Sequence, residues 1–75
     1  MYEITFVYNF ETHTGKPKRE IEKLNGCMIK SYGVVKDSVT LFVLCDCKES
    51  FILCKTILKD KYNINPNKIK KLSKW

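Results

Sequence analysis

The sequence contains no apolar run that approaches the roughly 20 residues a helix needs to cross a bilayer. Its opening residues, MYEITFVYNFE, include Glu3 and Glu11, whereas the charged start of a signal peptide is basic. We therefore expect a cytoplasmic protein that does not engage a membrane. The sequence also has no internal repeat, low-complexity segment or interdomain linker, so residues 1–75 are expected to form a single compact domain.

Motifs for catalysis and cofactor binding are equally absent. His13 is the only histidine and has no cysteine or serine nucleophile beside it in the sequence, so we interpret it as a solvated loop residue. The GKP at residues 15–17 lacks the glycine spacing and the Ser or Thr of a phosphate-binding loop. The acidic residues do not cluster as an acid–base pair would. We expect no enzymatic activity, no bound metal and no cofactor.

Arginine is scarce, although the chain is basic. The 14 basic residues outnumber the 8 acidic ones, giving a net charge of +6, and Arg19 is the only arginine. A positive balance favours polyanions such as nucleic acid or an acidic protein surface. Sites that read guanine edges usually use arginine, so sequence-specific base recognition is not favoured. A genome rich in AT would also produce many lysines, asparagines and isoleucines, and this alternative stays open.

The four cysteines do not have the spacing of a zinc site. The last three follow the pattern C-x-C-x6-C, whereas zinc fingers and ribbons need paired C-x2-4-C segments. Buried free thiols in a reducing compartment are the favoured interpretation. The alternatives are a disulfide, or a metal site made of Cys45, Cys47 and either Cys27 or His13. Cys47 is the one candidate for a reactive thiol, because it would begin a helix whose N-terminus stabilises a thiolate.

Three strands are predicted. Residues 39–45 are apolar on both faces, which is typical of a central strand, with Val39, Leu41, Val43 and Cys45 sharing one face. Residues 1–10 alternate between apolar and polar positions, as in a half-buried strand. Residues 27–35 form a further candidate, joined to residues 39–45 by a short polar connection that predicts a hairpin.

Two helices are predicted, one after the first strand of the sequence and one after the third. Pro17 and Gly26 bracket a short helix, and residues 11–16 before it are expected to form a loop. Asp46, with Glu49 three residues later, is expected to cap a longer helix that begins near Cys47. The buried face of that helix should carry four residues at helical spacing, Phe51, Cys54, Leu58 and Tyr62.

The order of elements predicts an α+β fold of the ferredoxin-like (split βαβ) class, β-α-β-β-α-β. The first and third strands would be central, and both helices would cover one face of the sheet. The last strand is ambiguous, because Asn65 and Pro66 also favour a short C-terminal helix over residues 66–75. Fold class alone does not identify a function.

The uncovered face of such a sheet would present aromatic and basic side chains together. It is expected to carry Thr5, Val7, Lys30, Tyr32, Thr40 and Phe42. Aromatics beside lysines suit the stacking of RNA or single-stranded DNA bases, although the sequence signature of an RNA-recognition motif is absent. The basic tail, which ends in Trp75, would add phosphate contacts, so the predicted nucleic-acid-binding residues are Lys30, Tyr32, Phe42, Lys68, Lys70, Lys71 and Lys74.

A protein-binding function is the alternative. A short, basic chain without a catalytic motif is also typical of a small regulator or inhibitor from a virus or mobile element. Its target would be a host protein with an acidic face or a nucleic-acid groove. An apolar sheet face is costly to expose, so two copies could also pack their sheets together as a homodimer.

Overall fold

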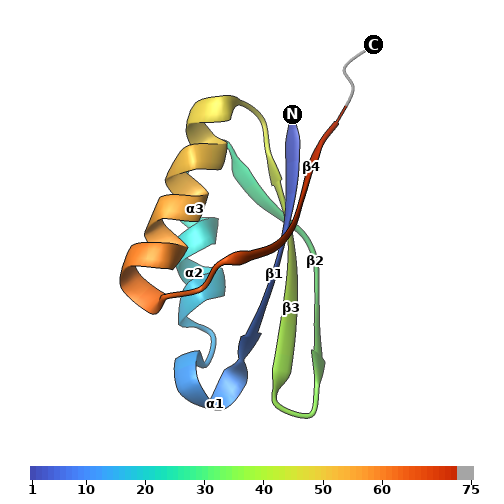
Figure 1. Cartoon of the computed structure of the whole chain (residues 1–75), viewed down its shortest axis with the longest axis vertical. Coiled ribbons are helices and arrows are strands. Elements are labelled where there is room, and N and C mark those ends of the chain that lie inside the picture. The colour runs from blue at the N-terminus through green and yellow to red at the C-terminus, as the bar shows by residue number, and fades with distance from the viewer. Residues whose placement is uncertain (73–75) are drawn as a thin grey trace.

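The most apolar segment forms a strand in the middle of the sheet. The computed structural model describes residues 1–72, and its elements are β1 (Tyr2–Asn9), α1 (Phe10–His13), α2 (Lys16–Glu22), β2 (Cys27–Val35), β3 (Ser38–Cys45), α3 (Lys48–Tyr62) and β4 (Pro66–Lys71). The strands form one antiparallel sheet in the order β2-β3-β1-β4, so β1 and β3 are central as expected. Figure 1 shows the helices gathered on one side of this sheet.

The core lies between the sheet and the helices. Ile4 and Phe6 of β1 pair with Val43 and Leu41 of β3, and all four side chains are fully buried. The helices contribute four further fully buried residues, Pro17, Ile21, Cys54 and Leu58. Val39, Leu41, Val43 and Cys45, which were predicted to share a face, are all fully buried. Burying one valine or leucine side chain contributes about 1.5–3 kcal/mol.

The longest helix, α3, begins one residue later than expected, and its cap is different. Cys47 is the N-cap residue and makes no side-chain capping bond. The prediction that Asp46 caps this helix is wrong, because Cys47 has the N-cap position and the Asp46 carboxylate lies 3.3 Å from the Ser50 hydroxyl. The Asp46 backbone N–H donates to the Gly26 carbonyl at 2.9 Å, which continues the β2–β3 pairing beyond Cys45. Asn63 ends the helix in the left-handed conformation.

The segment expected to be a loop contains a one-turn helix, α1. The Asn9 side chain accepts hydrogen bonds from the N–H groups of Glu11 and Thr12, at 2.8 and 3.3 Å, which is a typical N-cap arrangement. The following helix, α2, has Pro17 in its first turn, as expected. Gly26 then has φ of +83°, a conformation that favours glycine.

The last two features of the fold are the β2–β3 connection and the C-terminal segment. The β2–β3 hairpin is confirmed, with Val35 paired to Ser38 and a two-residue turn between them. The C-terminal segment is a strand, β4, which adds to the edge of the sheet beside β1. Proline has no backbone N–H to donate to the sheet, and Pro66 is tolerated because it is the first residue of an edge strand. Among residues 1–72, no helix is long and apolar enough to span a bilayer.

Candidate functional site

The face of the sheet opposite the helices is here called the open face. Directly paired residues on neighbouring strands share a face, so the pairing of the sheet defines its members. Thr5 pairs with Phe42 on one side and Lys68 on the other, and Glu3 pairs with Leu44 and Lys70. The open face includes Glu3, Thr5, Val7, Asn9, Met28, Lys30, Ser31, Gly33, Val35, Ser38, Thr40, Phe42, Leu44, Lys68 and Lys70.

Three lysines on the open face surround one carboxylate. Lys30 Nζ lies 2.9 Å from Glu3 Oε2, and Lys68 and Lys70 stand on the neighbouring strand β4. The hydrogen bond from Lys30 lowers the pKa of Glu3 below its ordinary 4.5, and the charges of Lys30, Lys70 and Lys68 lower it further. Three positive charges against one negative charge leave this part of the open face cationic.

Phe42 lies between these lysines. It is half-buried on the central strand β3, with Ser31 as its pairing partner on β2 and Thr5 as its partner on β1. Lys30, on β2, therefore lies on one side of Phe42, and Lys68, on β4, lies on the other. Phe42 is the single aromatic residue on the open face of the described chain, so the face offers one ring on which a base could stack.

Two of the predicted binding residues lie on the other face. The register shifts between Ile29 and Ser31, so Tyr32 pairs with the buried Leu41 and faces the helices. Lys18 Nζ of α2 lies 5.3 Å from the centre of the Tyr32 ring. The expectation that Tyr32 belongs to the open face is therefore wrong, because the bulge reverses the alternation of β2.

Lys71 is also separated from the other tail lysines. It pairs with Tyr2, whose ring stacks on Phe51 of α3 at 4.4 Å, so Lys71 stands on the helix side. Four of the predicted residues, Lys30, Phe42, Lys68 and Lys70, thus share the open face. Lys74 and Trp75 lie outside the described residues.

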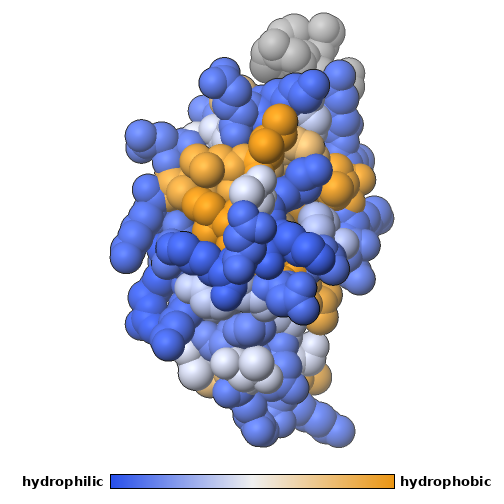
Figure 2. Space-filling model, turned by 60° about the vertical axis from the view of Figure 1, so that its left-hand side comes forward, coloured by the Kyte–Doolittle hydropathy of each residue, from blue (hydrophilic) through white to orange (hydrophobic). Residues whose placement is uncertain are grey.

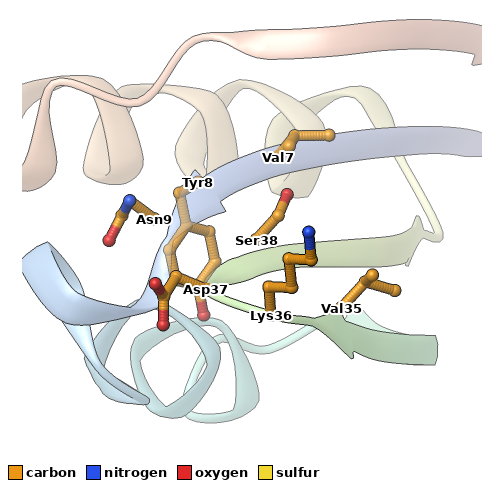
Figure 3. A pocket seen from close by; sticks show the side chains of 7 residues that line it. All are labelled: Val7, Tyr8, Asn9, Val35, Lys36, Asp37 and Ser38. Carbon is orange, nitrogen blue, oxygen red and sulfur yellow. The ribbon is translucent and has the colours of Figure 1, made fainter.

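Figure 3 shows a hollow where the β2–β3 turn meets the end of β1. Its volume is about 360 Å³. Tyr8 points toward α2 and Val7 points away from it. Val7 and Val35 are 41% and 74% exposed, so the hollow extends the apolar part of the open face. Its only carboxylate is Asp37, without a histidine or second carboxylate beside it, and the lining shows no acid–base pair.

A second apolar patch lies on the helical side. Figure 2 shows hydrophobic residues gathered over the upper half of that side, where α3 begins in Figure 1. Ile52 and Leu53 of α3 are 46% and 45% exposed. Neither residue belongs to the four predicted for the buried face of this helix.

His13 is not a solvated loop residue. It is half-buried, and its ring packs edge-on against Tyr8 and Tyr62, with centroid distances of 6.0 and 5.4 Å. Tyr62 ends the 15-residue helix α3, whereas Cys47 precedes its start. Because a helix rises 1.5 Å per residue, these positions are about 20 Å apart. A Cys47–His13 pair, catalytic or metal-binding, is therefore excluded.

Three of the four cysteines form a cluster, here called the thiol cluster: Cys27, Cys45 and Cys54. Their Sγ atoms all lie within 4.8 Å of one another. Cys45 and Cys54 are buried, and Cys27 is half-buried. Cys47 is exposed and lies outside the cluster, with its Sγ 3.4 Å from the Ser50 hydroxyl. The alternative of a metal site with Cys45 and Cys47 as ligands therefore does not match the structure. The expected burial of Cys54 was the signal that could have indicated the cluster.

The thiols of the cluster influence one another. A hydrogen bond from Cys54 lowers the pKa of Cys45 to about 7. Burial, and after it the neighbouring Cys45, raise the pKa of Cys27 to about 12. The pKa of Cys54 is raised first by its hydrogen bond to Cys45 and then by burial. Cys45 is thus the thiol of the cluster that loses its proton most readily.

Comparisons with protein-family models, with curated proteins and with solved structures find no match to this chain. The function is therefore inferred from the residues of the chain itself.

Proposed function

We propose that the open face binds single-stranded nucleic acid, RNA or DNA, without sequence specificity. The observation that supports this is the position of Lys30, Lys68 and Lys70 around Phe42 on one uncovered face of the sheet. An aromatic ring on which a base stacks, with lysines placed for the phosphates on either side, is the general design of single-strand binding surfaces. The proposal includes a ferredoxin-like architecture, which is supported by the central strands β1 and β3 and the helices on one face.

The lysines would act in two ways. Lys68 and Lys70 are exposed and form no ion pair with the other described residues, so their charges are available to phosphates. Lys30 is held by Glu3, and a phosphate must compete with that carboxylate. Water and salt screen an exposed ion pair of this kind, so the exchange costs little. Binding should therefore depend mainly on β4 and Phe42.

The experiment is fluorescence anisotropy of a labelled 12-nucleotide oligouridine, titrated with protein at several salt concentrations. Neutralising Z phosphates of a single strand gives a slope of log K against log salt of about −0.7Z. Three lysine contacts thus predict a slope of about −2. No binding at low salt, or binding that is indifferent to salt, would overturn the proposal.

A second candidate function, a protein interface on the same face, has its own support. Val7, Met28 and Val35 are exposed apolar residues of the open face, and their arrangement suits a face-to-face homodimer or a protein partner. Light scattering on the purified chain with and without the oligonucleotide separates the two. A monomer that gains the mass of the RNA supports nucleic-acid binding, whereas a dimer that ignores RNA supports the protein interface.

A further inference from the structure

The thiol cluster has the dimensions of a metal site. Cys27 and Cys45 are direct pairing partners at one end of the β2–β3 hairpin, with their Sγ atoms 3.7 Å apart. Cys54 approaches from α3, and all three sulfur atoms lie within 4.8 Å of one another. Thiolates about 2.3 Å from a common ion lie about 4 Å from each other. The three sulfur atoms therefore need to move only slightly to bind one ion.

The backbone around the cluster is held in place. The Ser50 hydroxyl of α3 donates to the Asn25 carbonyl at 3.1 Å, which ties the start of β2 to the helix. The Cys27 thiol lies 3.5 Å from the Ser50 carbonyl. Gly26 is required in this corner, because a Cβ atom there would overlap the side chains of Ser50 and Asp46. The helix and the hairpin thus present their thiols to each other in a preorganised geometry.

We propose that Cys27, Cys45 and Cys54 bind one soft cation, Cu(I), in three-coordinate geometry. Soft thiolate and thioether ligands select Cu(I), whereas structural Zn(II) sites are almost always four-coordinate. Among the described residues, no fourth cysteine, histidine or carboxylate has a ligand atom in this group. The number of ligands therefore favours Cu(I) over Zn(II).

A surface depression borders the cluster. Its volume is about 280 Å³, and the half-buried Cys27 lines it together with Met1 and Met28. Thioether sulfur is a soft ligand that can hold Cu(I) weakly as it approaches the thiols. Binding replaces the three S–H protons, which pass to solvent, so Cu(I) and three thiolates leave a site of charge −2. The copper is neither oxidised nor reduced in this step.

The test is an anaerobic titration of the full, reduced chain with Cu(I) against bicinchoninate, a chromophoric Cu(I) chelator. The wild-type chain is expected to remove one equivalent of Cu(I) from the chelator, and Cys47→Ser is expected to match it because Cys47 lies outside the cluster. Cys27→Ser should lower the affinity at least tenfold. Failure of the wild-type chain to compete, equal binding by Cys27→Ser, or loss of binding in Cys47→Ser would overturn the proposal.

A second readout applies if Cys27→Ser does not fold. Alkylation of the wild-type chain is followed by mass spectrometry of its peptides, with and without one equivalent of Cu(I). Copper is expected to slow alkylation of the three cluster cysteines at least tenfold and to leave the rate at Cys47 unchanged. Equal rates with and without copper would overturn the proposal, as would protection of the cluster by Zn(II) but not by Cu(I).

Discussion

Lys30 and Glu3 form an ion pair across the open face, reaching from β2 to β1 over the intervening strand β3. Their separation of 2.9 Å holds the only acidic residue of the open face next to its lysines. Glu3 thereby competes with any anionic ligand for Lys30, and it restrains the cationic character of the face.

Replacing Glu3 by glutamine should strengthen nucleic-acid binding. The change releases Lys30 and adds one unit of net positive charge to the open face, so the affinity for oligouridine should rise several-fold at low salt. Glu22→Gln is the matched control, because this substitution makes the same change in charge on α2, where Glu22 pairs with Lys18. Equal effects of the two variants would mean that net charge, and not the Glu3–Lys30 pair, sets the affinity.

The same pair predicts a dependence of stability on pH. The pKa of Glu3 in the folded chain is lowered below 4.5 by its hydrogen bond to Lys30, so the folded state favours the charged carboxylate. The stabilisation is complete above pH 4.5 and is lost as the pH falls through the lower, folded pKa. Urea unfolding between pH 7 and pH 3 should therefore show a smaller loss of stability for Glu3→Gln than for the wild-type chain.

Phe42 should contribute to binding through its ring. Stacking on one base is worth about 1–3 kcal/mol, so Phe42→Leu should weaken oligouridine binding by roughly 5- to 150-fold while keeping an apolar side chain on β3. Tyr32→Leu is the control, because Tyr32 faces the helices. If Tyr32→Leu weakens binding as much as Phe42→Leu does, the bound strand does not lie on the open face.

Tyr8 carries a buried hydroxyl without a hydrogen-bond partner among the described residues. Tyr8→Phe removes this uncompensated polar atom and should increase the free energy of unfolding by about 1 kcal/mol, measured by urea titration. Burial raises the pKa of Tyr8 above its ordinary 10.0, and the charge of Tyr32 is a second, smaller cause of the same increase. The wild-type chain should thus lose stability as the pH rises above 10, and Tyr8→Phe should lack this part of the loss. A less stable Tyr8→Phe would show that the hydroxyl has a partner.

Two glycines should respond oppositely to alanine. Gly26 has φ of +83° and no room for a Cβ atom, so Gly26→Ala should destabilise the chain by more than about 1 kcal/mol. Gly33 lies in β2 with nothing within 4 Å of the added atom, so Gly33→Ala should leave stability unchanged or raise it by up to about 1 kcal/mol. Thermal unfolding compares them directly, and equal melting temperatures would contradict the close approach at Gly26.

The sequence identifies most of this fold because its strongest patterns agree with the tertiary contacts. The alternation in β1 and the face made by Val39, Leu41, Val43 and Cys45 both specify which side of the sheet is buried. The last segment could not be assigned, since its strand state depends on pairing with β1 and not on local preference. The helix α1 had a local signal in Asn9, a preferred N-cap residue.

The candidate sites were harder to predict, since both depend on non-local geometry. One extra residue in β2 reverses the face of Tyr32, and no local residue pattern marks this bulge. The thiol cluster takes one cysteine from each of three elements, whereas the spacing of ligands along a chain shows only sites made within one segment. Lys68 and Lys70 could be separated from Lys71 only once β4 was known to be a strand.

The most direct test of the open face compares two adjacent lysines of β4. Lys70→Ala and Lys71→Ala remove the same charge, but Lys70 stands on the open face and Lys71 on the helix side. Lys70→Ala should weaken oligouridine binding and reduce the salt slope by about 0.7, whereas Lys71→Ala should change neither appreciably. Equal losses in the two variants would contradict binding on the open face.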